Sequence, residues 1–228
     1  IPGSDRTMLW ENEVISDPYL RRNLDHSRWS EKQSWAFRTR FSVPEDMRKA
    51  KKLRLVFAAV DYEVEVYLNG EKIASHLGAF IPLEIDISNA VLRNQGNILA
   101  MVFAPATQAL PNQLQDDHAD FAKYHRSQMS YGWDWMRAMV PVGITDRVWL
   151  ESSDNVRIKD IFFRSKSSHV TLAIESEVAV AGQYQLTIKM EPFNFVGQGL
   201  SLQAVQALEQ SENHTFQFEF DVADVHYW

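Results

Sequence analysis

The stretch that decides the fold is residues 64–75, which read VEVYLNGEKIAS. Apolar side chains recur at every second position before Asn69-Gly70, as in a half-buried antiparallel strand. Asn-Gly suits a two-residue type I′ turn, because both of its central positions need a positive φ. The stretch therefore predicts a β-hairpin whose strands are residues 64–68 and 71–75.

The same period of two continues on both sides of this hairpin. Helical signal is scarce, with one short turn predicted at 44–47 and a candidate without clear amphipathy at 119–127. Many short strands separated by turn signals predict an all-β protein, either a jelly roll or another β-sandwich. The further predicted strands are residues 37–43, 53–59, 81–87, 98–103, 148–151, 158–163, 170–174, 184–190 and 216–222.

A domain boundary is predicted in the polar run at residues 152–155. Residues 1–152 are expected to form a jelly-roll β-sandwich, and residues 153–228 a smaller sandwich of immunoglobulin type. In the last predicted strand Phe216, Phe218 and Phe220 share one face with Val222. The second segment has about 75 residues, whereas an immunoglobulin fold uses about 100, so we expect this domain to be truncated.

Composition excludes some classes of function. The formal net charge is −7, which argues against a nucleic-acid partner, because phosphate binding needs clustered Lys and Arg. The chain has no cysteine, so it has neither a disulfide framework nor a thiolate metal site. No apolar run approaches the roughly 20 residues of a membrane helix, and no membrane partner is expected. The cellular compartment stays open.

Signatures of catalysis and of cofactor binding are missing. There is no Gly-x-Ser-x-Gly, and no glycine-rich phosphate loop, so no cofactor is predicted. His118 and His125 lack a zinc spacing. Asp116-Asp117 and Asp120 allow a structural Ca²⁺ but lack the calcium-loop pattern, so we favour a solvated acidic loop and predict no metal.

The long segment 104–147 interrupts the strand pattern and ends in an aromatic-rich stretch. There Trp133 and Trp135 flank Asp134, directly after Gly132. An aromatic ring stacks on the apolar face of a sugar, and a carboxylate accepts hydrogen bonds from two adjacent hydroxyls. The alternative is a Trp-rich plug in the sandwich core, with Asp134 capping backbone amides.

Several motifs, taken together, resemble the N-terminal region of family 2 glycoside hydrolases of the β-mannosidase type. The hairpin 66–70, together with Asp61, resembles the jelly-roll hairpin shared across the wider family, and the run 128–135 resembles the β-mannosidase branch. The other matching segments are residues 1–4, 7–9, 17–19, 141–144 and 148–151, with Asn23, Trp35 and Phe37.

The resemblance implies a galactose-binding-like sugar-binding domain over residues 1–152, followed by an immunoglobulin-like domain. It places the two catalytic glutamates in a TIM barrel beyond this chain, so the fragment alone is expected to be inactive. Trp133 and Asp134, with Trp135 beside them, are implied to bind the terminal β-linked mannose against that barrel. An uncovered docking face is expected to expose apolar side chains, through which the fragment could dimerise.

The chain departs from the family pattern around these motifs. Met136-Arg137 replace a Gly-Pro, Thr145 replaces a Trp, His125-Arg126 replace an Arg-Lys pair, and Arg6 replaces a His. Loss of that Gly and Pro changes the backbone of the loop, so a shifted substrate or a divergent subfamily is expected. The sequence also lacks the strand that usually precedes its opening Pro-Gly, which suggests trimming.

Three functions stay open on the sequence. The first is the accessory region of an exo-acting β-mannosidase-like enzyme, whose parent could instead act on a β-galactoside or β-glucosaminide. The second is a stand-alone carbohydrate-binding module. The third is a structural or interaction sandwich whose Trp-rich loop belongs to the core.

Overall fold

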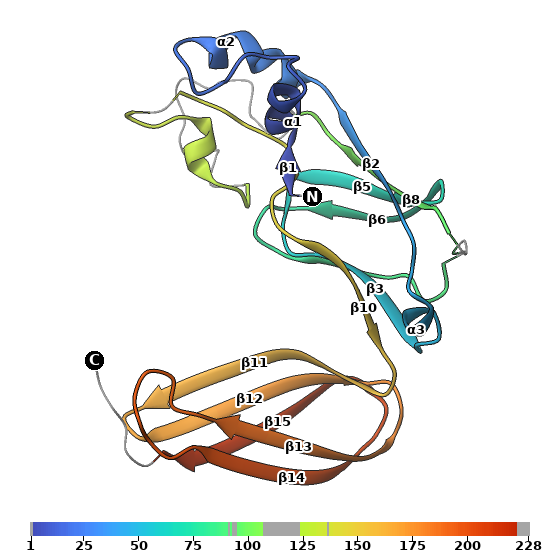
Figure 1. Ribbon diagram of the computed structural model, residues 1–228, viewed down its shortest axis with the longest axis vertical. Helices are drawn as coiled ribbons and strands as arrows, with labels where there is room; N and C mark the ends of the chain where they lie inside the picture. Colours follow the sequence, from blue (N-terminus) through green and yellow to red (C-terminus); the bar gives the residue numbers. More distant parts are fainter. Residues whose placement is uncertain (1, 91, 93–94, 107–123, 136, 223–228) are drawn as a thin grey trace. The chain divides into compact units, whose positions relative to one another are not determined.

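The computed structural model describes residues 2–90, 92, 95–106, 124–135 and 137–222 (Figure 1). This part of the chain consists mainly of antiparallel strands joined by short helices, which confirms the all-β prediction. It divides into two compact units, residues 1–152 and 153–228, each with its own sheets.

The first unit contains two principal sheets and one small one. In the larger sheet the strand order is β2-β8-β5-β6, and in the second it is β10-β3-β7. Each strand predicted for this unit has a counterpart. The larger sheet holds β2 (Trp35–Phe41), β8 (Asn97–Phe103), β5 (Glu63–Leu68) and β6 (Glu71–Leu77); the second holds β10 (Val148–Ser153), β3 (Lys52–Phe57) and β7 (Leu83–Asp86); the small one holds β1 (Gly3–Ser4), β9 (Gly143–Ile144) and β4 (Val60–Asp61).

The hairpin of β5 and β6 turns at Asn69-Gly70 as predicted. Asn69 has a φ of 54° and Gly70 a φ of 95°, the two positive values that a type I′ turn requires. The Asn69 side chain also accepts a hydrogen bond from the Ile98 N–H at 2.9 Å, which ties the turn to β8. The turn and the central strands of the larger sheet therefore support one another.

The core of the first unit lies between the two principal sheets. On β5 the side chains of Val64, Val66 and Leu68 are buried and alternate with more exposed residues, as the period of two predicts. Phe57 of β3 and Phe103 of β8 are fully buried in the same cluster. Burial of these apolar side chains is the main stabilising contribution to the unit.

One side of the sandwich, between β2 and β10, is open. A cavity of about 440 Å³ lies there, mostly between apolar side chains that include Phe37, Leu55, Val148 and Leu150. Within the described sheets β2 pairs only with β8, and β10 only with β3. Two unpaired strand edges therefore border an apolar groove.

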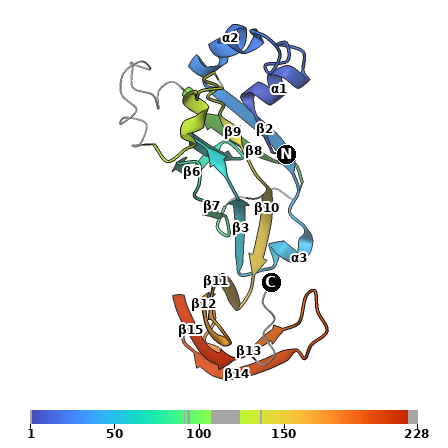
Figure 2. The ribbon, with the colours of Figure 1, turned by 90° about the vertical axis from the view of Figure 1, so that its left-hand side faces the viewer.

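Short helices gather at one end of the first unit. Figures 1 and 2 show α1 and α2 at the end of the sandwich that lies away from α3. The predicted turn at 44–47 is α3, but the other helices were not predicted, and residues 124–127 of the weak helical candidate are not helical. The helical elements are α1 (Asp5–Glu11), α2 (Asn23–Ser27), the 3-10 helix η1 (Arg28–Lys32), α3 (Glu45–Arg48) and the 3-10 helix η3 (Gln128–Tyr131).

The second unit consists of a three-stranded and a two-stranded antiparallel sheet. Phe216, Phe218 and Phe220 pack on its core, on the single face that their spacing predicts. The strand β14 was not predicted, since its Gln and Ala residues have weak strand propensity. The strands are β11 (Val156–Lys166), β12 (His169–Val178) and β15 (Ser211–Asp221) in one sheet, and β13 (Gly182–Met190) and β14 (Leu200–Leu208) in the other.

Candidate functional site

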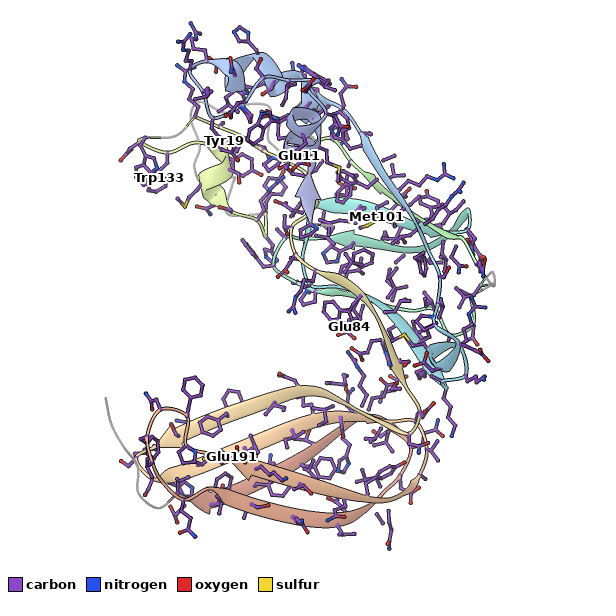
Figure 3. The ribbon with its side chains drawn as sticks, viewed as in Figure 1. Glu11, Tyr19, Glu84, Met101, Trp133 and Glu191 are labelled. Carbon is purple, nitrogen blue, oxygen red and sulfur yellow. The ribbon has the colours of Figure 1, made fainter. Side chains whose placement is uncertain are left out.

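The three predicted sugar-contacting residues lie at the tip of one loop. The helix η3 ends at Tyr131, and the next residue, Gly132, has a φ of 109° that turns the chain outward. The Met139 N–H then donates to the Ser130 carbonyl at 2.8 Å and closes the base of the loop. Figure 3 shows Trp133 at this tip, away from the sheets. We call residues 130–139 the tip loop.

Residues 133–135 of the tip loop are exposed to solvent. Trp133 is 55% exposed and Trp135 73% exposed, and their ring centroids lie 6.2 Å apart with the planes at 68°. Asp134 between them is exposed, and no hydrogen bond or ion pair joins its carboxylate to another residue of the described part. The interpretation of this motif as a core plug is therefore wrong. The chain displays an aromatic pair and an available carboxylate together.

A buried arginine lies beneath the tip loop. The Arg126 side chain is fully buried and forms an ion pair of 3.0 Å with Asp61 at the end of β4. Its Nη2 also donates to the Pro141 carbonyl at 2.7 Å, and its guanidinium lies 5.4 Å from the ring centroid of Tyr62 and 5.9 Å from that of Tyr131. Burial raises the pKa of the Asp61 carboxyl above its usual value, although the nearby Arg126 charge opposes that rise.

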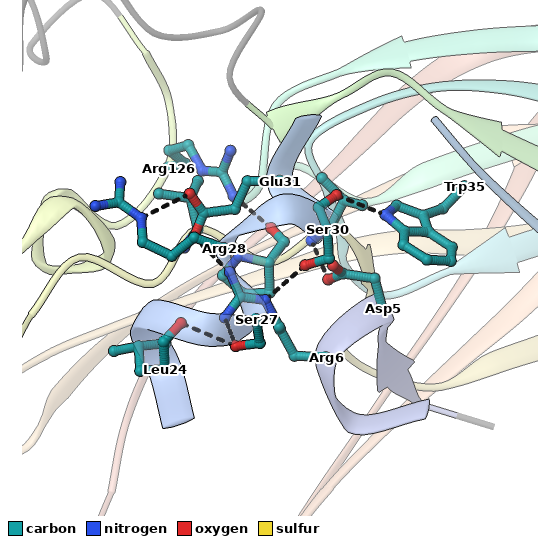
Figure 4. A network of polar contacts seen from close by, with 12 residues as sticks. Asp5, Arg6, Leu24, Ser27, Arg28, Ser30, Glu31, Trp35 and Arg126 are labelled. Carbon is teal, nitrogen blue, oxygen red and sulfur yellow. Dashed lines mark hydrogen bonds and ion pairs between the residues drawn. The ribbon is translucent and has the colours of Figure 1, made fainter. Parts of the chain in front are cut away.

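A second buried network holds the segment that returns from the tip loop (Figure 4). Arg6 of α1 forms an ion pair with Glu31 at 2.5 Å, and it donates to the hydroxyls of Ser27 at 2.8 Å and Ser30 at 2.7 Å. Glu31 also accepts the Val140 N–H at 3.4 Å. The Arg6–Glu31 pair of α1 and η1 is thus hydrogen-bonded to the backbone of Val140, just after the tip loop.

An exposed ion pair joins the tip loop to α2. Arg137 lies 2.5 Å from Asp25, and Arg22 lies 3.2 Å from the same carboxylate. The Arg137 hydrogen bond, followed by that of Arg22, lowers the pKa of Asp25 below its usual value. Arg137 is one of the two residues that, by the motif resemblance, are expected to replace a Gly-Pro, and here it forms a contact between the loop and α2.

The sequence motif indicated the exposed residues Trp133, Asp134 and Trp135, but not the buried side chains that hold the loop. Asp61, Arg6 and Arg126 stood out only as motif positions, and nothing in the sequence marked Glu31. The candidate calcium ligands Asp116, Asp117 and Asp120 lie outside the described residues. Within the described ranges there is no group of three or more potential metal-ligating side chains, and no helix there is long and apolar enough to cross a membrane.

Comparison with known proteins connects this geometry to a family. The family model described as "Glycosyl hydrolase 2 galactose-binding domain-like" matches residues 1–146. β-Mannosidase B of Aspergillus fumigatus is 24% identical over 244 residues, which cover 100% of this chain and 28% of that protein. The mannosylglycoprotein endo-β-mannosidase of Lilium longiflorum is 29% identical over 206 residues, 82% of this chain and 21% of that protein.

A solved structure shows the same fold. The crystal structure of β-D-mannosidase from Dictyoglomus thermophilum aligns with a TM-score of 0.84 at 22% identity, over 97% of this chain and 28% of that one. The chain thus spans between about a fifth and little more than a quarter of the length of these relatives. The family resemblance read from the motifs is confirmed, and the chain belongs to the glycosyl hydrolase 2 galactose-binding domain-like family.

Proposed function

We propose that this chain is the N-terminal accessory region of an exo-acting, β-mannosidase-like glycoside hydrolase. In this proposal Trp133, Asp134 and Trp135 bind the terminal β-linked mannose, and the catalytic barrel belongs to the same polypeptide. The observation that carries the proposal is the tip loop, which displays two Trp rings and an available carboxylate on a closed base. The second unit then serves as the immunoglobulin-like module that follows the sugar-binding domain.

The chemistry of the tip loop suits a neutral sugar. Carboxylate oxygens of Asp134 can accept hydrogen bonds from two adjacent hydroxyls, and an indole ring can cover an apolar C–H face. In a glycosidase with two catalytic carboxylates these residues take no part in proton transfer or nucleophilic attack. Their contribution is to bind and orient the sugar, and such positioning accelerates a reaction through the geometry of the bound substrate.

Kinetics of the full-length protein on an aryl β-mannoside test the proposal. We expect Asp134→Ala to lower kcat/KM by about a hundredfold or more, since a buried sugar hydroxyl would lose a charged acceptor. Asp146→Ala is the matched control, because Asp146 is also an exposed loop aspartate and lies outside the tip loop. Full activity of Asp134→Ala would overturn the sugar-contact assignment.

Substrate and product analysis test the remaining parts of the proposal. If the protein cleaves an aryl β-galactoside or β-glucosaminide but not the β-mannoside, the assignment of mannose as the bound sugar is wrong. Release of oligosaccharides instead of monosaccharide would replace the exo mode with the endo mode named for the lily relative. Hydrolysis by residues 1–228 alone would contradict the accessory role.

The exposure of both Trp rings also favours a second candidate, a stand-alone carbohydrate-binding module. That function requires residues 1–228 alone to bind mannan or manno-oligosaccharides measurably. Calorimetry of this chain, with Trp133→Ala as the comparison, distinguishes the two candidates. Heat that disappears in the variant would support the module, whereas absence of heat with any glycan favours a site that the barrel completes.

A further inference from the structure

We propose that Arg126, paired with Asp61, is a positioning residue that sets the place of Trp133 and Asp134 in the sugar site. The inference deepens the proposed function and rests on it. Its basis is that one buried guanidinium contacts Tyr131 at the start of the tip loop and Pro141 just after it. Arg126 itself is buried and does not touch the sugar in this proposal.

The first contact fixes the start of the tip loop. The Arg126 guanidinium lies against Tyr131, the last residue of η3. Gly132, where the chain turns outward, follows immediately. A cation held against an aromatic face contributes more once both groups are removed from water, as the fully buried Arg126 side chain is here. The direction in which Trp133 leaves η3 therefore depends on this contact.

The second contact fixes the segment that returns. Arg126 Nη2 donates to the Pro141 carbonyl at 2.7 Å, and the next residue, Val142, is bonded to Asp5 of α1. The same guanidinium also pairs with Asp61 and lies against Tyr62. Through Arg126, both ends of the tip loop are therefore connected to Asp61 of β4, in the body of the sandwich.

Stability alone does not account for this pair. Taking an arginine and a carboxylate out of water costs several kcal/mol per ion, and apolar residues of the same volume often serve stability as well or better. Arg126 Nε and Nη1 moreover have no hydrogen-bond acceptor among the described residues. A buried pair with these costs is better explained by geometry, since this one guanidinium pairs with Asp61, donates to the Pro141 carbonyl and lies against the Tyr131 ring.

The other ties of the tip loop are weaker. The Arg137–Asp25 pair is exposed, and salt screens such pairs. The Val140 N–H reaches Glu31 at 3.4 Å, and only on the returning side. The Arg126 guanidinium is buried and contacts both Tyr131 at the start of the loop and Pro141 just after it. Its replacement should loosen the tip loop while the sheets keep their order.

Amide hydrogen exchange of the full-length protein tests the positioning role without reference to activity. In Arg126→Met we expect exchange over residues 127–140 to rise at least about tenfold, with β12 and β15 unchanged. Arg126→Lys keeps the charge, so exchange over the same residues should rise less. This variant replaces Arg126→Met in the experiment if the Met variant does not fold. Arg54→Met is the matched control, because Arg54 is a buried arginine on β3. Unchanged exchange over 127–140, or an equal rise in Arg54→Met, would overturn the inference.

A double-mutant cycle then tests whether Arg126 acts through the sugar contact. We expect Arg126→Lys to lower kcat/KM on the aryl β-mannoside by about ten- to a hundredfold, and to have little further effect in Asp134→Ala. Additive losses would overturn the inference. If Asp134→Ala alone is fully active, the proposed function fails, and the exchange experiment still decides whether Arg126 positions the loop.

Discussion

Asp5 and Val142 hold each other through two reciprocal hydrogen bonds. The Asp5 N–H donates to the Val142 carbonyl at 2.9 Å, and the Val142 N–H donates to Asp5 Oδ1 at 3.0 Å. The bonds join the start of α1 to the segment that returns from the tip loop. The buried Asp5 side chain thereby helps to hold the segment that follows the candidate sugar site.

Replacement of Asp5 should therefore destabilise the first unit. Asp5→Ala leaves the buried Val142 N–H without its acceptor, which costs about 1–3 kcal/mol in the free energy of unfolding. Asp5→Asn keeps an acceptor oxygen in place and should cost less. Urea unfolding monitored by circular dichroism measures both variants. Equal losses in the two variants would contradict the role of this acceptor.

The buried Arg6–Glu31 pair should behave differently when one or both members are removed. Arg6→Met takes the nearer cation from the buried Glu31 carboxylate and leaves it Arg28 at 3.4 Å, and we expect a loss of about 3 kcal/mol in the free energy of unfolding. Arg6→Met combined with Glu31→Leu removes both charges and should recover much of that loss. Thermal unfolding of the single and double variants provides the measurement. A double variant that is less stable than Arg6→Met would refute the explanation.

The pair between Arg137 and Asp25 should be visible in the titration of the carboxyl group. Arg137→Met removes the main cause of the low pKa of Asp25, so that pKa should rise toward its usual value. Arg22→Met is the matched control and should raise it less, because Arg22 is the smaller cause. NMR titration of the side-chain carboxyl resonances follows both changes. An unmoved Asp25 pKa in Arg137→Met would show that the ion pair does not persist in solution.

Asp86 should make the stability of the first unit depend on acidic pH. Partial burial disfavours its ionised form, but bonds from Lys52 and Ser88 outweigh that effect and hold the pKa at about 2. A lowered pKa in the folded state contributes stability above the unfolded pKa of 3.8, and this stability is lost as the pH falls from there toward about 2. Since the side chain is 41% exposed, solvent screening limits the contribution to about 1 kcal/mol.

Unfolding measured between pH 5 and 2 (about the window of the effect) tests this expectation. Asp86→Asn should unfold at lower urea concentration than the parent at pH 5, and the difference should shrink as the pH approaches 2. Asp146→Asn is the control, an exposed aspartate that is not bonded to Lys52 or Ser88. A difference that stays constant with pH would rule out the linkage.

Strand β11 should promote self-association of this chain. Ile161 and Phe163, on one face of the strand, are 56% and 52% exposed, and Phe162 on the other face is 60% exposed; exposed apolar surface favours association. We expect residues 1–228 to elute as a dimer or larger at high concentration, and Phe163→Ser to shift the equilibrium toward monomer. Phe80→Ser in the first unit is the control, at a Phe that is 69% exposed. A monomer at every concentration in gel filtration with light scattering would contradict the expectation.

Most of the longer strands could be predicted because their signals are local. Alternation within a few residues and the Asn69-Gly70 turn are enough to identify β5 and β6. The helices α1 and α2 are too short for a helical period to show, and α1 is held by contacts such as that of Arg6 with Ser30, far along the chain. Local patterns cannot reveal those contacts.

The candidate site divides in the same way. Trp133, Asp134 and Trp135 are adjacent in the sequence, so their residue types alone suggest a sugar contact. Arg126 becomes significant only because folding brings Asp61 and Pro141 to its guanidinium. Such a junction depends on tertiary structure, and one sequence contains no direct signal for it.

The open groove between β2 and β10 has a thermal consequence. Part of its apolar lining, including Phe37 and Val148, is only partly buried in the folded chain. Unfolding raises the heat capacity in proportion to the apolar area that is newly exposed to water, and surface already in contact with water adds little. The heat-capacity change of the first unit should therefore be smaller, and its stability curve flatter with temperature, than for a closed sandwich of the same length.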